Sequence, residues 1–336
     1  MRYDTGTEIM SKKTIAKITF FVIFSALAAG CGGGSKEELK GGSKSGSKGG
    51  KSEKVSAENP NFDAPKVVGT ITSEDIVESS GVAASRCTSD VLWTHNDSGN
   101  GPFIFAINPK GEVLATFKVK DVKNKDWEDI AAFKDAAGEC YIYIGDIGDN
   151  DEKAPSHEVY RIREPVVGSG TPGSSIKQPL EMTIKDTVRF SYPDTPQNAE
   201  TLMVHPVTGS IYVATKHESG PSFVYKIQPS FGSPDVQKAE KVGQISVPAV
   251  PNGLLTGGDI SPDGRHAMLC DYTQGYELTL PEGSANFDDI WQQTPQPVDL
   301  GKRPHGESVG YNIDGTAVFA TSEEEEAPVI EVKRRQ

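Results

Sequence analysis

The chain has 336 residues, of which 34 are Lys or Arg and 47 are Asp or Glu, so its formal charge is −13. This length can bury a sizeable core in one large or two ordinary domains, and a hydrophobic fraction of 36% excludes wholesale disorder. The acidic balance excludes nucleic acid as a partner, because binding its phosphates needs a basic surface.

The first thirty residues have the pattern of a secretory signal. Lys12, Lys13 and Lys17 precede an apolar run over 18–29, which is short for a membrane span. The run ends in L-A-A-G-C at Cys31, which resembles a bacterial lipobox. That resemblance implies a signal peptide over 1–30, a lipidated, palmitate-type anchor on Cys31, and a place in the bacterial cell envelope on its periplasmic or cell-surface side. An ordinary signal peptide or an N-terminal anchor is the alternative.

Residues 31–65 are rich in Gly, Ser and Lys and show no apolar periodicity. We therefore expect a disordered tether here, followed by a folded, monomeric domain over 66–336. A flexible chain of about 30 residues has a typical reach on the order of 30 Å. The domain is then held near the membrane without inserting into it.

One repeat unit recurs along the rest of the chain. It contains an acid leading into an apolar strand, a turn, a second apolar strand, and a third alternating strand that usually stops at proline. The first strands begin at Glu78, Glu128, Glu200, Asp259 and Glu307. Asp-Gly and Thr-Gly pairs in the intervening turns favour hairpins. A weaker fourth strand follows four of the units, and residues 66–72 are predicted to supply the one that the last unit lacks.

Units of four strands, closed by an N-terminal strand, predict an all-β fold: a β-propeller with five blades. Six blades remain compatible with the sequence, because residues 166–185 in the longest interval have no clear pattern. A two-sheet sandwich is the alternative, but it does not explain the repeated unit.

The repeated acids are the main candidates for chemistry. In a propeller the first strands start at one mouth of the central channel, and the second strands return to it, so polar residues at these ends converge. Converging carboxylates either have raised pKa values or are neutralised by a cation. Ca²⁺ suits them, because it takes roughly six to eight oxygen ligands in flexible geometry. The candidate ligands are Glu78, Asn96, Glu128, Asp129, Asp146, Glu200, Asp259 and Glu307. In the alternative, each acid only caps backbone N–H groups at a blade junction.

Four basic or titratable residues near this mouth are candidate catalytic residues: His95, Lys216, Arg303 and His305. Lys216 and Arg303 would balance an anionic ligand, and a His beside a metal-bound water would act as general base. The alternative is that they are ordinary loop residues.

Three cysteines follow Cys31. Cys87 and Cys140 precede the second strands of neighbouring repeats, on the face opposite the acids, so they could form a disulfide in an oxidising compartment. Cys270 lies within an apolar strand and is expected to be a small buried side chain.

Four motifs carry a further resemblance: W-T-H-N-D-S-G, D-W-E-D-I-A (126–131), G-D-I-G-D-N (145–150) and Y-P-D-x-x-x-N-A-E-x-L (192–202). They resemble a group of secreted bacterial β-propeller proteins with no assigned activity. In architecture the chain is distantly similar to esterase-like phytases and calcium-dependent propeller lactonases, which implies a metal at the channel mouth. No residue-level motif of those enzymes is matched.

Two functions remain open at this point. The first is metal-dependent hydrolysis of a small anionic ester or lactone at the channel mouth. The second is a noncatalytic surface module that binds a protein or a glycan, with calcium in a structural role.

Overall fold

The computed structural model describes residues 59–168, 170–247 and 254–335. The expected signal peptide, Cys31 and most of the tether lie outside the described residues. In the described part of the chain, no helix is both long and apolar enough to cross a membrane.

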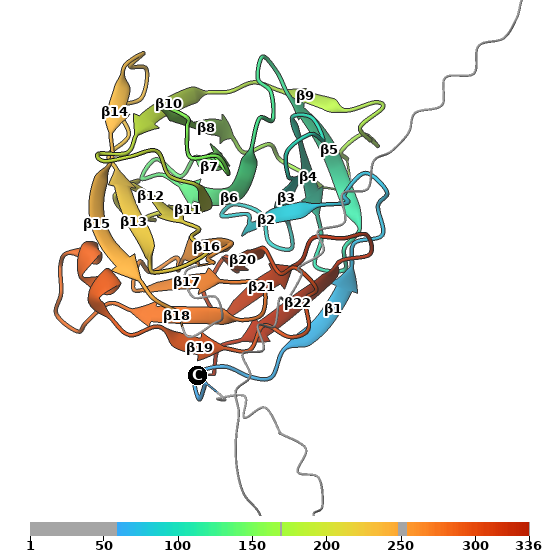
Figure 1. Ribbon diagram of the computed structural model, residues 1–336. Helices are drawn as coiled ribbons and strands as arrows, with labels where there is room; N and C mark the ends of the chain where they lie inside the picture. Colours follow the sequence, from blue (N-terminus) through green and yellow to red (C-terminus); the bar gives the residue numbers. More distant parts are fainter. Residues whose placement is uncertain (1–58, 169, 248–253, 336) are drawn as a thin grey trace, which may run out of the picture. The chain divides into compact units, whose positions relative to one another are not determined.

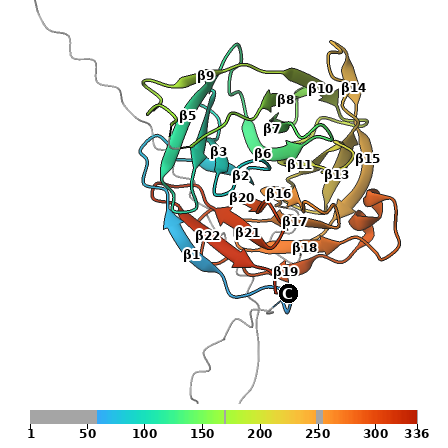
Figure 2. The ribbon, with the colours of Figure 1, turned by 180° about the vertical axis from the view of Figure 1, so that it is seen from behind.

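Five sheets surround one central axis (Figures 1 and 2). The first blade, from the axis outwards, contains β2 (Ser79–Ala84), β3 (Leu92–Asn96), β4 (Phe103–Ile107), β5 (Val113–Val119) and β9 (Leu180–Met182). The second contains β6 (Trp127–Lys134), β7 (Cys140–Asp146), β8 (His157–Arg163), β10 (Asp186–Ser191) and β14 (Val236–Lys238). The third contains β11 (Ala199–Val204), β12 (Ile211–Thr215), β13 (Ser222–Ile227) and β15 (Glu240–Ile245).

The fourth blade contains β16 (Gly257–Ile260), β17 (His266–Cys270), β18 (Gly275–Thr279) and β19 (Gln296–Val298). The fifth contains β20 (Ser308–Tyr311), β21 (Ala317–Thr321), β22 (Pro328–Lys333) and β1 (Lys66–Thr70). The innermost strands β2, β6, β11, β16 and β20 contact one another in turn, and β20 contacts β2, which closes the ring.

The prediction of an all-β propeller with five blades is therefore confirmed. The unclear segment 166–185 contains one short strand, β9, which joins the first blade and does not form a sixth. The predicted closure is also present, because β1 pairs antiparallel with β22 as the outer strand of the last blade. Residues before Lys66 extend this contact: Phe62 is buried and bridges to Arg334.

Three blades receive an additional element from the next blade along the chain. Strand β9 leaves the second blade and pairs parallel with β5 of the first. Strand β14 leaves the third and pairs parallel with β10 of the second. The 3₁₀ helix η1 (Phe287–Gln292) leaves the fourth and packs on β15 of the third, where Trp291 lies against Gly243. These additions cover outer strand edges that would otherwise stay unpaired.

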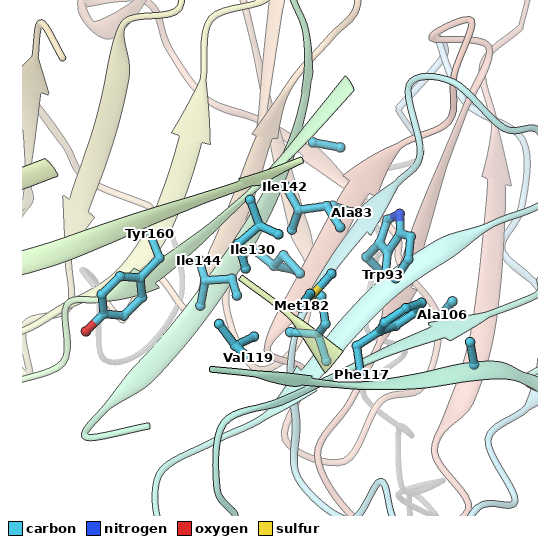
Figure 3. Packing of buried hydrophobic residues seen from close by; sticks show 14 of the residues in the cluster. Ala83, Trp93, Ala106, Phe117, Val119, Ile130, Ile142, Ile144, Tyr160 and Met182 are labelled. Carbon is cyan, nitrogen blue, oxygen red and sulfur yellow. The ribbon is translucent and has the colours of Figure 1, made fainter. Parts of the chain in front are cut away.

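Apolar side chains fill the spaces between neighbouring blades. Because each blade packs against a neighbour on both faces, central strands such as β12 are buried along their whole length instead of alternating. Figure 3 shows one such layer, in which Trp93 and Phe117 of the first blade face Ile130 and Ile142 of the second. Apolar side chains buried at the blade junctions therefore stabilise the ring.

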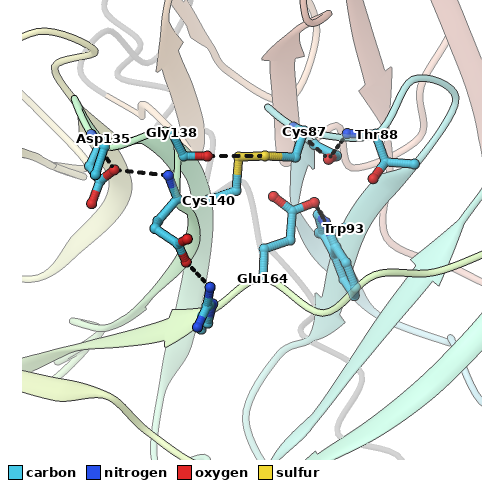
Figure 4. Close-up of a disulfide and its surroundings, with 11 residues drawn as sticks. Cys87, Thr88, Trp93, Asp135, Gly138, Cys140 and Glu164 are labelled. Carbon is cyan, nitrogen blue, oxygen red and sulfur yellow. Dashed lines mark hydrogen bonds and ion pairs between the residues drawn. A yellow bond between two sulfur atoms is a disulfide. The ribbon is translucent and has the colours of Figure 1, made fainter.

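A disulfide joins the first two blades. Cys87 lies between β2 and β3, Cys140 begins β7, and their Cα atoms are 6.1 Å apart (Figure 4). Beside it, the indole N–H of Trp93 donates to Glu164 Oε1 at 2.9 Å, which also connects these blades. Cys270 is buried and has a free thiol.

Candidate functional site

Three carboxylates converge at one mouth of the channel. Asp97 follows β3, Asp126 precedes β6, and Glu128 is the second residue of β6. One oxygen from each lies within 4.8 Å of an oxygen of the other two. Oxygen donors at this separation are suited to a hard divalent cation.

The local sequence explains how two of these acids meet. The pairing of β6 with β7 shifts register between Trp127 and Asp129, so Glu128 occupies a bulge at the start of the strand. Gly148 of the G-D-I-G-D-N motif lies against both acids. A Cβ added there would be 2.2 Å from Glu128 Oε1 and 2.5 Å from Asp126 Oδ2, so a larger residue would displace the carboxylates.

Three more acids extend the group around the mouth. Glu200 occupies the same bulge position in β11, and Lys216 Nζ lies 2.7 and 2.6 Å from its two oxygens. Glu307, just before β20, interacts with Glu323, just after β21. Lys216 is thus the basic side chain that contacts this group directly, and it is already held by Glu200.

Burial and mutual repulsion raise the pKa values of these carboxyls. Burial raises the pKa of Asp126 to about 6, with Asp97 and Asp146 adding to the effect. Burial raises the pKa of Glu200 to about 7, although Lys216 opposes this, and burial with Glu323 and Glu200 raises that of Glu307 to about 10.

The pKa of Glu128 is also raised well above its usual range, first by burial and then by Glu200, Asp97 and Asp126. The mouth therefore contains more carboxyl groups than Lys216, the basic side chain in contact with them, can neutralise. A bound cation would remove this imbalance.

A hollow of about 820 Å³ adjoins the acids. Lys216 lies on its wall, 5.0 Å from the ring centroid of Tyr272. Asn198 fixes the wall opposite: its Oδ1 accepts the N–H of Asp149 at 2.8 Å, and its Nδ2 donates to Asn150 Oδ1 at 3.2 Å. This arrangement offers amides, an ammonium and an aromatic ring to a small molecule beside the carboxylates.

Two predicted residues on β3 do not reach the mouth. His95 is fully buried, its Nδ1 lies 3.0 Å from the Asn96 carbonyl, and its ring packs edge-on to Trp127. Burial lowers the pKa of His95 to about 4, so the ring is neutral at pH 7. Asn96 uses its Oδ1 to accept the N–H groups of Val77 and Glu78. The expected roles of His95 as a base and Asn96 as a ligand are therefore wrong.

Two predicted ligands brace the channel instead. Asp129 is fully buried, and its carboxylate accepts N–H groups from Ile130, Leu202 and Gly258, which belong to three blades. Burial raises its pKa well above the usual range despite these bonds. For Asp129 the alternative of a backbone cap is the one that the structure supports.

Asp259 is also a structural residue. It lies near the far end of β16, two residues after that strand begins, so it does not reach the mouth. Its Oδ2 is 2.8 Å from Arg86 Nη2 and accepts the N–H of Tyr311 at 2.9 Å. The expectation that it joins the other acids is wrong.

Asp146 and Glu78 lie at the edges of the group. Asp146 Oδ1 accepts the N–H of Asp126 at 2.9 Å, and its Oδ2 accepts the Tyr160 hydroxyl at 3.0 Å. It therefore positions Asp126 and is not free as a ligand. Glu78 is exposed at the rim, where its Oε2 accepts from Asn100 Nδ2 at 2.5 Å.

The two remaining basic candidates also differ from the prediction. Arg303 is buried, and its guanidinium donates to the main-chain carbonyls of Asp271, Ser308 and Thr321. It is thus not available to balance an anionic ligand. His305 lies at the exposed rim, with its Nδ1 3.1 Å from Glu324 Oε1.

Four residues of the mouth were not among the candidate ligands: Asp97, Asp126, Tyr272 and Glu323. The sequence nevertheless placed Asp97 and the acidic run over 323–326 at this mouth. Three of them carried a signal, because Asp97 is next to Asn96, Asp126 begins D-W-E-D-I-A, and Glu323 begins an acidic run. Tyr272 lies just after a second strand, as Lys216 and Asp97 do, and that shared position could have identified it.

No protein-family model matches the chain, and no curated protein matches its sequence. Among solved structures, it is similar to the PQQ-bound aldose sugar dehydrogenase of Streptomyces coelicolor. The identity is 11% and the TM-score 0.48, over 81% of this chain and 98% of that one. This likeness carries no argument about ligand or reaction, and the fold is established by the strand pairing above.

Proposed function

We propose that the channel mouth binds a divalent cation, Ca²⁺ by ligand preference, and hydrolyses a small anionic ester or lactone in a protein anchored to the cell envelope through Cys31. The observation that carries the proposal is the convergence of Asp97, Asp126 and Glu128 within 4.8 Å. An all-oxygen ligand set favours Ca²⁺ over Zn²⁺, which prefers nitrogen and sulfur.

Cation binding and substrate orientation are assigned to different residues. Asp97, Asp126 and Glu128 would hold the cation. When bound, it supplies a Lewis acid for the ester carbonyl and lowers the pKa of water. Asn150, Asn198 and Tyr272 would orient the substrate in the adjoining hollow. Because Lys216 is paired with Glu200, the positive charge that an anionic substrate needs would come mainly from the cation.

A noncatalytic module that binds a protein or a glycan is the second candidate, and one observation favours it. Among the described residues, His95 and His305 do not face the hollow as bases. His217 does line it, but its Nδ1 lies 2.7 Å from the Pro221 carbonyl and its Nε2 3.2 Å from Gln197 Oε1. With both nitrogens engaged, His217 is a poor proton acceptor for a substrate.

Calorimetric titration with Ca²⁺ tests the cation site. We expect saturable binding to the full chain, and an affinity weakened at least about tenfold by Asp126→Asn or Glu128→Gln, because each removes a charged ligand. Glu282→Gln is the matched control, since it removes an exposed carboxylate from a distant turn. Absence of saturable binding to the unaltered chain would refute the site.

A panel of phosphoesters, carboxylic esters and lactones, assayed with Ca²⁺ and with EDTA, separates the two functions. Turnover that needs Ca²⁺ and is lost in Glu128→Gln supports the hydrolase. Calcium binding without turnover on any substrate supports the binding module.

A further inference from the structure

A second hollow lies between the outer parts of the first two blades. Its volume is about 700 Å³. Its walls come from the connection between β5 and β6, from strands β8 and β10, and from the connection between β9 and β10 (Figure 1). We call it the interblade groove. None of Asp97, Asp126 and Glu128 lines it.

Positive charge collects in the interblade groove, although the whole chain is acidic. Four basic side chains line it: Lys120, Lys123, Lys125 and Arg189. The acids that line it are Asp121 and Glu158. The lining residues therefore carry two more basic than acidic side chains, and Glu181 and Asp146, just outside the lining, pair with two of them, Lys120 and Lys125.

Ion pairs hold three of the four basic side chains of the groove and leave Lys123 without a carboxylate partner among the described residues; Lys125 Nζ, for example, also lies 3.7 Å from Asp146 Oδ2. Glu158 forms ion pairs with two cations: its Oε2 lies 3.1 Å from Lys125 Nζ, and its Oε1 lies 2.9 Å from Arg189 Nε. It also accepts the Tyr160 hydroxyl at 2.8 Å. Lys120 pairs at 3.0 Å with Glu181, and Lys123 is exposed and has no hydrogen bond or ion pair within the described parts of the chain.

The inner surface of the groove is partly apolar. Val122 and Ile184 are half-buried there, and the Tyr160 ring lies beside them. The hydroxyls of Thr183 and Thr187 are further donors along the same wall. Cations around a partly apolar surface match a ligand with an anionic head and a short apolar tail.

From this charge and shape we propose that the interblade groove binds a small organic anion, with a phosphate-like head on Lys123, Lys125 and Arg189 and an apolar tail on Val122 and Ile184. The head interacts with Lys123, which has no other partner among the described residues, and with Lys125 and Arg189, which share Glu158. The tail removes exposed apolar surface from water. Lys125 links this site to the proposed cation site, because its Nζ lies 3.7 Å from Asp146 Oδ2 and Asp146 Oδ1 accepts the N–H of Asp126.

Calorimetry on the full chain with three probes tests the proposal. Inorganic phosphate presents the head alone, hexanol the tail alone, and hexyl phosphate both. We expect hexyl phosphate to bind at least about tenfold more tightly than phosphate, because only it gains apolar contact. Hexanol is expected to show no saturable binding.

Matched variants locate the site. Lys123→Gln should weaken hexyl phosphate binding about tenfold, as expected for loss of one charge-assisted contact. Lys302→Gln, which removes the charge of another exposed lysine, should change it less than about twofold. Val122→Ser should reduce the advantage of hexyl phosphate over phosphate and leave phosphate binding unchanged.

Three results would overturn the inference: no saturable binding of hexyl phosphate, equal losses in Lys123→Gln and Lys302→Gln, or binding that Val122→Ser leaves untouched. Far-UV circular dichroism and the Ca²⁺ titration on the same variants show whether the fold and the mouth are intact. Absence of Ca²⁺ binding to the unaltered chain, with hexyl phosphate still bound, would refute the proposed cation site and leave the groove standing.

Discussion

Removing the disulfide should measurably destabilise the propeller. Cys87 and Cys140 are separated by 53 residues, and cross-linking a loop of that length lowers the entropy of the unfolded chain by an amount worth about 4 kcal/mol at 25 °C. Engineered and native bridges often deliver less, so we expect Cys87→Ala/Cys140→Ala to lose roughly 2–4 kcal/mol of unfolding free energy. Urea unfolding followed by tryptophan fluorescence measures this loss.

Two controls test whether the lost stability comes from the disulfide. A reducing agent should bring the unaltered protein to the midpoint of the double variant, and it should leave the double variant where it is. The hydrogen bond between Trp93 and Glu164 remains in both proteins, so the contact between the blades is retained. A loss below about 1 kcal/mol, with unchanged denaturant slope, would show that the bridge does not restrict the unfolded chain as the loop length requires.

Three further outcomes follow from the buried charges. Asp259→Ala leaves Arg86 without its carboxylate and should lower the unfolding free energy by about 3–5 kcal/mol in urea, whereas a loss under about 1 kcal/mol would contradict a buried pair. In EDTA, Asp126 should favour a higher melting temperature as pH falls from 7 towards 4, because it has a folded pKa of about 6 against 3.8 and takes up its proton first in the folded state, whereas His95, with a folded pKa of about 4, acts in the opposite direction; compared with the unaltered protein, Asp126→Asn should shift the change in melting temperature between pH 7 and 4 towards destabilisation. Glu307→Gln should melt at or above the unaltered protein at pH 8 in EDTA, since burial and Glu323 already keep Glu307 protonated, and a drop of several degrees would refute that protonation.

The blade count could be predicted because each blade is one repeat of the sequence. An apolar strand, a Gly-containing turn and a second apolar strand have a fixed order in the chain, and this order does not depend on tertiary contacts. The closing strand was predictable for the same reason, because residues 66–72 have no repeat of their own. The extra strands β9 and β14 were not, since short exposed segments pair with a neighbouring blade only after the ring exists.

The candidate site could be predicted only where strand ends align. Glu128, Glu200 and Glu307 gather because each lies at the start of an inner strand. Asp259 occurs in a similar local sequence, but β16 begins two residues earlier, which moves that side chain along the channel. Asp259 corresponds to Asp129 and not to Glu128, because each is the third residue of its strand and accepts the N–H of the residue after it.

The residues of β3 illustrate a second limit. Successive side chains on a strand point to opposite faces, and both faces of a blade are buried between its neighbours. His95 therefore points into a blade junction, while Asp97, one residue beyond the end of the strand, is the one that reaches the mouth. Sequence reasoning chose the polar residues correctly as a group but could not distinguish the last strand residue from the first loop residue.

The seam between β1 and β22 has a consequence for how the protein is made. Strand β1 is synthesised before every other strand of its blade, so it has no partner until β22 has left the ribosome. Glu307 and Glu323 belong to that same blade, so the growing polypeptide has only part of the acidic rim until this blade is synthesised. Ring closure is therefore needed to hold these acids in place, and a chain truncated before Pro328 would keep both acids but lack the pairing of β22 with β1.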